Sequence, residues 1–190
     1  FTTGDSADVT VAGEFVQNGA GNSVLGDDLT STNDGFSFDT NVSILSTDSI
    51  LIQTGEGAGD DIVVGGTFGG VDDDVTLDAG ELGDVTLTGA VDLGTGSLTI
   101  RDADTVVFGS TLDANSFTQS DGTTSTTLGG AVTTTGAFAF TGEALTLNGS
   151  GNSIGTTMTV TNAGAFTTGD SADVTVAGEF VQNGAGNSVL

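Results

Sequence analysis

The chain has 190 residues and a formal net charge of −25, with a single Lys or Arg against 26 Asp and Glu. It contains no histidine, cysteine, tyrosine, tryptophan or proline. This excludes a disulfide framework, a thiolate nucleophile, the usual zinc sites and a Ser-His-Asp triad. One cation cannot make the phosphate contacts that nucleic acid requires, and the negative field repels anionic membranes, so we expect neither partner.

Despite this charge, the chain can bury a core, because 36% of its residues are hydrophobic and its mean hydropathy is +0.16. No apolar run is long enough to span a bilayer, and the first residues lack the basic and apolar regions of a signal peptide. We therefore expect no membrane span, and a mature or internal segment of a protein.

One long repeat is evident. Residues 1–25, FTTGDSADVTVAGEFVQNGAGNSVL, recur without a change as residues 166–190, which gives a period of 165 residues. The sequence therefore predicts one full repeat, 1–165, and the start of the next, 166–190, within a single continuous segment spanning 1–190. We expect this segment to come from a longer tandem array.

Along the chain, short apolar-polar-apolar triplets alternate with Gly, Asp, Asn, Ser and Thr. Such triplets are typical of short strands with one buried face, and the intervening residues are typical of turns. Triplets with a hydroxyl in the middle are Val9-Thr10-Val11, Phe36-Ser37-Phe38, Val42-Ser43-Ile44, Val75-Thr76-Leu77, Val85-Thr86-Leu87, Leu98-Thr99-Ile100, Leu145-Thr146-Leu147 and Met158-Thr159-Val160. Variants are Ile50-Leu51-Ile52, Ile62-Val63-Val64, Val106-Val107-Phe108 and Phe138-Ala139-Phe140. No segment is typical of a helix.

Alignment of the triplets predicts an all-β fold, a parallel β-helix or β-solenoid with about eight coils per 165-residue repeat. The expected coils are 22–41, 42–60, 61–83, 84–104, 105–124, 125–144, 145–164, and 165 onward joined to 1–21 of the next register. With coils ~4.8 Å apart, residues 1–25 and 166–190 should superpose after a shift of roughly 38 Å along the axis and a modest rotation.

Two other β architectures fit the sequence less well. An immunoglobulin-like array needs domains of ~100 residues with a long-range pattern that this chain lacks. The Ca²⁺-binding nonapeptide roll needs tandem GGxGxD motifs, whereas only scattered GD and GDD occur.

Four stretches carry a resemblance to a known group of proteins: DIVVGGTFGGVDDDVTLDAG (61–80), TVVFGSTLDANSFTQSDGT (105–123), GGAVTTTGAFAFTG (129–142) and ADVTVAGEFVQNGAGNSVLGDDLTST (7–32). They resemble the β-strand repeats of very large bacterial surface proteins, akin to filamentous-haemagglutinin and autotransporter passengers. The resemblance implies a right-handed β-helix, export to the cell exterior, and a role as an adhesin, fibre or matrix component.

Stacked coils place equivalent side chains above one another, which predicts two aspartate columns. If Phe36, Ile50 and Val75 are equivalent core positions, Asp34, Asp48 and Asp73 form one column, two residues before each strand. Asp61 and Asp84, each directly before a strand, form a second column. Ca²⁺ accepts six to eight oxygen ligands and suits such columns, although the chain requires no cofactor. The alternative is a solvated acidic face that keeps a fibre soluble.

Arg101, the single cation, follows the triplet Leu98-Thr99-Ile100. The coil alignment predicts that its guanidinium bonds to Asp78 or Glu81 in the preceding coil and to Asp121 in the following one.

Catalysis and ice binding are the less favoured alternatives. The densest acidic cluster, Asp72 to Asp74, resembles the acid/base groups of polysaccharide-active β-helix enzymes, but these usually add basic or tyrosine side chains that this chain lacks. We therefore expect no enzyme. Ice binding needs a regular threonine ladder, whereas runs such as Thr133 to Thr135 are irregular.

The sequence thus predicts a structural repeat segment of an extracellular bacterial fibre, stalk or matrix filament that provides length and stiffness. The main alternative is the shaft of a giant cell-surface adhesin whose binding tip lies outside this sequence. Expected partners are further copies, end to end or side by side, and a cell-surface or matrix polysaccharide.

Overall fold

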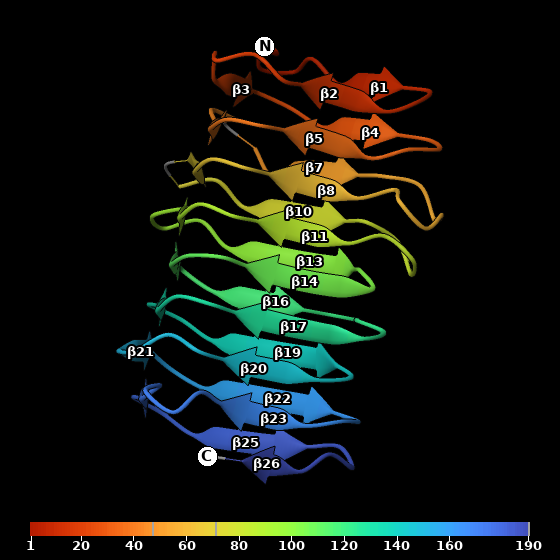
Figure 1. The fold of residues 1–190 in the computed structure, drawn as a ribbon. Coiled ribbons are helices and arrows are strands. Elements are labelled where there is room, and N and C mark those ends of the chain that lie inside the picture. Colours follow the sequence, from red (N-terminus) through yellow and green to blue (C-terminus); the bar gives the residue numbers. More distant parts are fainter. Residues whose placement is uncertain (47, 71, 190) are drawn as a thin grey trace.

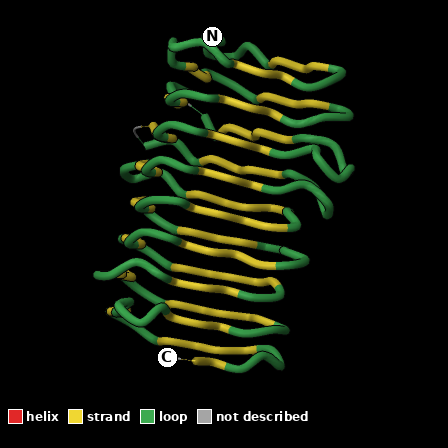
Figure 2. Tube along the Cα trace, in the orientation of Figure 1, coloured by secondary structure: helices red, strands yellow, loops and turns green. Residues whose placement is uncertain are grey.

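The computed structural model describes residues 1–46, 48–70 and 72–189, and in this part of the chain there are strands and turns but no helix (Figures 1 and 2). Leu190, the last residue of the repeated segment, lies outside the described residues. The two ends of the chain lie at opposite ends of a stack of coils (Figure 1). The all-β prediction is confirmed.

Each strand is short because the chain alternates buried and outward residues for only one triplet before a turn. In Val75-Thr76-Leu77, for example, both aliphatic side chains are buried and the threonine lies on the outer surface. All twelve predicted triplets lie within strands of the structure. The turn residues between them end each strand, so the chain changes direction after two to five residues.

The strands form three sheets, which we number in the order in which the chain visits them. Sheet 1 consists of β1 (Val9–Val11), β4 (Leu29–Ser31), β7 (Ile50–Gln53), β10 (Val75–Asp78), β13 (Leu98–Asp102), β16 (Phe117–Gln119), β19 (Phe138–Gly142), β22 (Met158–Asn162) and β25 (Phe180–Asn183). Sheet 2 consists of β2 (Phe15–Gln17), β5 (Phe36–Phe38), β8 (Ile62–Val64), β11 (Val85–Leu87), β14 (Thr105–Phe108), β17 (Ser125–Leu128), β20 (Leu145–Leu147), β23 (Phe166–Thr168) and β26 (Ser188–Val189). Sheet 3 consists of β3 (Ser23–Leu25), β6 (Val42–Ile44), β9 (Phe68–Gly70), β12 (Val91–Asp92), β15 (Leu112–Ala114), β18 (Val132–Thr134), β21 (Asn152–Ile154) and β24 (Val174–Val176).

Neighbouring strands in each sheet are parallel and come from successive coils. Val85, for instance, pairs with Ile62 in the preceding coil and with Val106 in the following one. Each complete coil therefore gives one strand to each sheet, and the three sheets enclose the interior. This is the predicted parallel β-solenoid. We call the turns between its sheets corner 1–2, corner 2–3 and corner 3–1.

The core is a continuous column of aliphatic and phenylalanine side chains along the solenoid axis. Phe108, Phe117 and Phe138 follow one another in it, with ring centroids 6.0 Å and 4.9 Å apart. All three are at most 1% exposed. Burial of each such ring contributes about 1.5–3 kcal/mol, so the interior is the main source of stability.

Glycine is required where coils approach one another closely. A Cβ at Gly35 would lie 2.4 Å from the carbonyl oxygen of Asp61, and one at Gly96 would lie 2.0 Å from that of Asp73. Any side chain at either position would force neighbouring coils apart.

The 165-residue repeat does not contain a whole number of coils. Residues 9–11 form β1 in sheet 1, but their identical copies, 174–176, form β24 in sheet 3. Within the described residues, β24 is the twenty-third strand after β1, so the repeat advances seven and two-thirds coils. The expected modest rotation between copies is wrong: the second copy is turned by one sheet. The error lies in the expected coil 42–60, which contains only β6 and β7.

Candidate functional site

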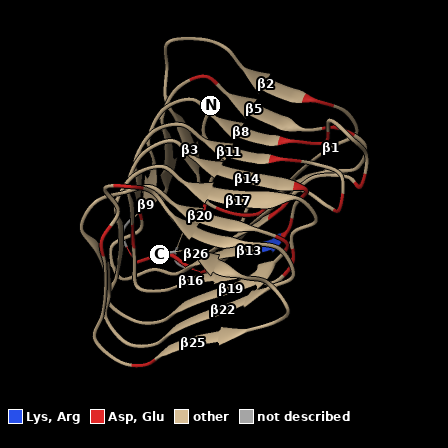
Figure 3. Ribbon diagram, turned by 60° about the horizontal axis from the view of Figure 1, so that its bottom comes forward, with Lys and Arg blue, Asp and Glu red and all other residues tan. Residues whose placement is uncertain are grey.

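Acidic residues are most numerous at corner 1–2, where the strands of sheet 2 begin (Figure 3). The acidic residues of this corner are Glu14, Asp34, Glu56, Asp60, Asp61, Asp78, Glu81, Asp84, Asp102, Asp104, Asp121 and Glu143. Corner 2–3 has Asp39, Asp170 and Asp173. Corner 3–1 carries nine more: Asp5, Asp8, Asp27, Asp28, Asp48, Asp72, Asp73, Asp74 and Glu179. The solenoid is therefore strongly acidic along two corners and weakly acidic along the third, and corner 1–2, the most acidic, is the first candidate for cation binding.

Arg101 lies at corner 1–2 and forms an ion pair with Asp78, with 3.0 Å between Nη1 and Oδ2. Leu77 pairs with Ile100 but Asp78 pairs with Asp102, so Arg101 is the extra residue of a β-bulge. The predicted contact with Asp78 is confirmed. The expected second contact, with Asp121, is not formed. In the described part of the chain no ion pair joins Arg101 to Asp121 or to Glu81.

Asp102, beside Arg101 in sequence, has a carboxylate oxygen that is buried without a hydrogen-bond partner among the described residues. Burial raises the pKa of Asp102, and the negative charges of Asp121 and Asp78 raise it further. One guanidinium therefore does not neutralise this part of the corner.

Asp61 and Asp84 form the second predicted column, and their register is confirmed by the pairing of the residues that follow them, Ile62 and Val85. Their carboxylates make a specific contact along the column. Asp61 Oδ1 accepts the backbone N–H of Asp84 at 2.9 Å, and Asp84 Oδ1 accepts that of Thr105 at 3.0 Å. Each side chain thus hydrogen-bonds to the next coil.

The same contact occurs at the other two corners. Asp74 Oδ1 accepts the N–H of Ser97 at 2.8 Å, and Asn41 Oδ1 accepts that of Thr67 at 2.9 Å. In each case the acceptor directly precedes a strand. Each of these four side chains therefore adds one hydrogen bond between coils, a structural role that was not predicted. Binding of Ca²⁺ by Asp61 and Asp84 stays a prediction.

The first predicted column, of Asp34, Asp48 and Asp73, is not formed as expected. Phe36 of β5 pairs with Ile62 of β8 in sheet 2, so Asp34 lies at corner 1–2. Asp48 and Asp73 lie at corner 3–1, two residues before strands that pair with each other. The alignment had matched a strand of sheet 2 with strands of sheet 1.

The two aspartates that remain in register have different surroundings. Asp48 is exposed, whereas Asp73 is 7% exposed. Burial raises the pKa of Asp73, and the charge of Asp72 raises it further. Asp73 therefore favours its neutral form more than an exposed aspartate does.

A third acidic group lies at corner 3–1 near the N-terminus. One carboxylate oxygen from each of Asp8, Asp27 and Asp28 lies within 4.8 Å of the others. The charge of Asp27, followed by burial and the charge of Asp28, raises the pKa of Asp8. This group was not predicted, although the Asp before Val9 and the Asp pair before Leu29 are visible in the sequence.

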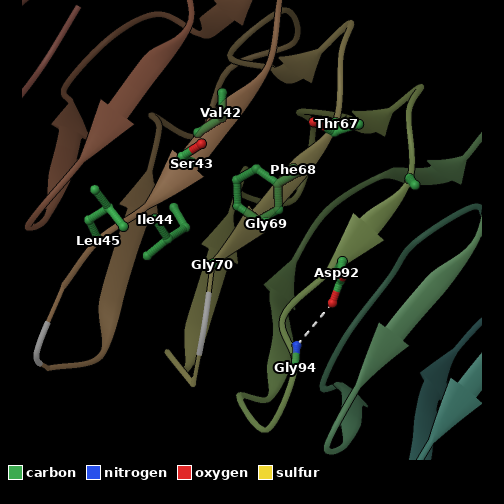
Figure 4. A pocket seen from close by; sticks show the side chains of 11 residues that line it. Val42, Ser43, Ile44, Leu45, Thr67, Phe68, Gly69, Gly70, Asp92 and Gly94 are labelled. Atoms are coloured by element: carbon green, nitrogen blue, oxygen red, sulfur yellow. Dashed lines mark hydrogen bonds between the residues drawn. The ribbon is translucent and has the colours of Figure 1, made fainter.

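The outer face of sheet 3 carries a shallow groove of about 490 Å³ (Figure 4). Gly69 and Gly70 of β9 leave it open between Ser43 and Asp92. Asp92, whose Oδ1 accepts the N–H of Gly94 at 3.2 Å, is the charged residue in its lining. Among the described residues, Asp92 is the one carboxylate in the lining of this groove.

Asp92 has an acidic neighbour outside the groove. It pairs with Asp113 in the next coil, and both side chains lie exposed on sheet 3. This pair was not predicted. Its signal was an aspartate in the middle of an apolar triplet, where the other triplets have a hydroxyl.

Outward threonines form only short runs. Thr76, Thr99 and Thr118 are successive partners on sheet 1, but Leu51 precedes them and Ala139 follows. This irregular ladder gives no extended ordered hydroxyl surface.

Comparison of the chain with family models, curated proteins and solved structures finds no match. None of the described residues forms a helix with the length and apolarity that a membrane span requires.

Proposed function

We propose that this chain is a structural repeat segment of an extracellular bacterial fibre, stalk or matrix filament, in which the solenoid provides length and stiffness. Each sheet is hydrogen-bonded along the whole axis, and the core continues through the coils without a break between subdomains. Such a stack resists bending because each coil is held by its neighbours on three sides. The resemblance to large bacterial surface repeats supports the extracellular location.

The observation that carries this proposal is the recurrence of one 25-residue segment at both ends of the stack. Residues 1–25 form a coil at one end, and the described copies, 166–189, form a coil at the other. A sequence that returns to the same coil after 165 residues can be extended by repetition, as expected where length itself is the product.

The main alternative, the shaft of a giant adhesin, uses the same geometry and adds a tip domain beyond this sequence. The expected partners are further copies of the repeat and a surface or matrix polysaccharide. Ca²⁺ bound at the acidic corners would reduce repulsion between stacked carboxylates, although no cofactor is required for the fold as proposed.

The proposal is tested by immunogold labelling of intact and of lysed source cells, with antibodies raised against this chain. We expect gold on filaments or on the outer surface of intact cells. Labelling confined to lysed cells would contradict the proposal. Gold spread along a filament supports the fibre, whereas gold along a stalk below an unlabelled tip supports the adhesin shaft.

A further inference from the structure

The two copies of the repeated segment fold onto themselves in the same way. In the first, Thr2 pairs with Val24, and the N–H of Thr3 donates to the carbonyl oxygen of Val24 at 2.9 Å. In the second, Phe166 pairs with Ser188. The segment therefore closes into one coil in which its first residues pair with its last, independently of what surrounds it.

The strands of the two copies pair with neighbouring coils along opposite edges. The first is covered by the residues that follow it: Val9 N–H donates to Asp28 O at 2.9 Å, and Asp39 N–H donates to Gln17 O at 3.0 Å. Its three strands pair with β4, β5 and β6.

The second copy is instead covered by the residues that precede it. Asn152 N–H donates to Asp173 O at 3.0 Å, and Ala177 N–H donates to Ile154 O at 2.9 Å. Its strands β24 and β25 pair with β21 and β22.

These two sets of hydrogen bonds use different backbone atoms of the same sequence. The following residues engage the N–H of position 9 and the carbonyl of position 17. The preceding residues engage the carbonyl of Asp173 and the N–H of Ala177, which correspond to positions 8 and 12. Because no atom is used twice, one segment can be paired on both edges at once.

We propose that the coil formed by residues 166–189 is a docking end for a further copy of residues 26–165 that follows it in the chain. Its first strands would stack on the second copy of the segment as 26–44 stack on 1–25. Each added copy is then turned by one sheet, so that the same face returns after three repeats, or 23 coils. This inference deepens the proposed function as a length-giving repeat and rests on it.

The exposed end fits this occupant. Phe15 is half-buried, with its ring centroid 6.2 Å from that of Phe36 and 5.5 Å from that of Phe38. The equivalent residue, Phe180, is 42% exposed beside an open cavity of about 280 Å³ lined by apolar side chains that include Val174 and Val176. A further copy would place its own two phenylalanines over Phe180 and close this end of the core.

The rotation of one copy relative to the next determines which surfaces a lateral partner meets. The acidic corner 1–2 of one repeat continues as a different corner in the next, because identical residues move to the adjacent sheet. A fibre built this way presents its more acidic and its less acidic corners in all three directions in turn. Lateral partners, including neighbouring fibres, would therefore meet equivalent surfaces on every side.

The test uses a chain of residues 1–190 followed by two further copies of residues 26–190. The sequence has no cysteine, so an Asp113→Cys substitution in each copy gives three labelling sites for maleimide-gold on an exposed strand. We expect electron microscopy to show one straight rod with gold particles about 37 Å apart along the axis and one-third of a turn apart around it. Particles aligned on one side, or disordered added copies, would overturn the inference.

A pair of variants checks the docking contact itself. The first variant carries Phe38→Asp only in the added copy of residues 26–165 that directly follows residue 190. It should disrupt the packing of this copy on the coil 166–189 and give two rods connected by a flexible point. Ser37→Asp in the same copy, which points outward, should leave the rod straight. A straight rod with both variants would overturn the docking contact. These results concern geometry in vitro, so they can fail independently of the cell-surface labelling that tests the proposed function.

Discussion

An aspartate directly before a strand can hydrogen-bond to the neighbouring coil through one of its two carboxylate oxygens. The Asp61 and Asp84 carboxylates accept backbone N–H groups one coil further on. This arrangement satisfies a donor at the corner, where the regular sheet pairing begins. Part of the acidic character of the chain is therefore structural.

Replacement of Asp84 tests this role. Asp84→Ala removes the acceptor for the N–H of Thr105 and should lower the free energy of unfolding by about 1–2 kcal/mol. Asp84→Asn keeps an acceptor oxygen and should lower it by less than half as much. Urea unfolding followed by circular dichroism measures both, with Asp113→Ala as an exposed control. Equal losses for the two Asp84 variants would contradict the hydrogen-bond role.

Protonation of Asp73, which is buried, and of Asp102, which is half-buried, should make the protein more stable in mild acid. Burial raises the pKa of Asp73 and of Asp102, so each binds a proton more tightly in the folded state. Their contribution to stability is greatest below the ordinary pKa of 3.8 and is lost as the pH rises through the folded pKa. Asp104 acts in the opposite direction, because hydrogen bonds from Thr123 and Thr124 lower its pKa.

We therefore expect the free energy of unfolding to rise as the pH falls from 7 towards about 4. Asp102→Asn, which mimics the protonated form, should increase stability at pH 7 and flatten this dependence. Urea titrations across this range provide the measurement. A stability that declines steadily from neutral pH in the unsubstituted chain would show that Asp104 and the other ionised carboxylates dominate.

At the scale of elements, the triplets were predictable because each carries its own signal of two inward apolar residues around one outward residue. The phase of the coils was not predictable, because all three sheets use the same kind of triplet. The long turn from Thr54 to Asp61 made 42–60 look like a complete coil, although its third strand begins only at Ile62. The missing strand put Asp34 in the wrong sheet in the prediction. Asp61 and Asp84 follow this segment in the chain, so their predicted register was correct.

Core position should decide the effect of a phenylalanine substitution. Phe117→Ala removes a fully buried ring between Phe108 and Phe138 and should cost about 3–5 kcal/mol. Phe180→Ala, at the exposed end coil, should cost about 1 kcal/mol or less because this ring is already 42% exposed. Thermal and urea unfolding of both variants gives the comparison. Similar losses would mean that the end coil is packed as tightly as the middle.

For the whole molecule, the charge of −25 opposes folding through repulsion between coils. Millimolar CaCl₂ should raise Tm by more than NaCl at equal ionic strength, since Ca²⁺ can bridge carboxylates such as those of Asp8, Asp27 and Asp28. A chelator should reverse the effect. Asp27→Asn should reduce the calcium-specific part, and Asp170→Asn should not. Equal increases of Tm with the two salts would contradict specific Ca²⁺ binding and would support a solvated acidic surface that is merely screened.

The direction of the sheet hydrogen bonds also determines how the protein responds to force. They run along the axis and join one coil to the next. A pull on the two ends of the chain is therefore concentrated on the last hydrogen bonds of the end coils, which can open one after another. A coil such as that between Val85 and Val106 takes 21 residues. Its release adds about 70 Å of extended chain for the loss of about 4.8 Å of rod. Under tension this rod would therefore unwind coil by coil from its ends and absorb mechanical work over a length many times its own.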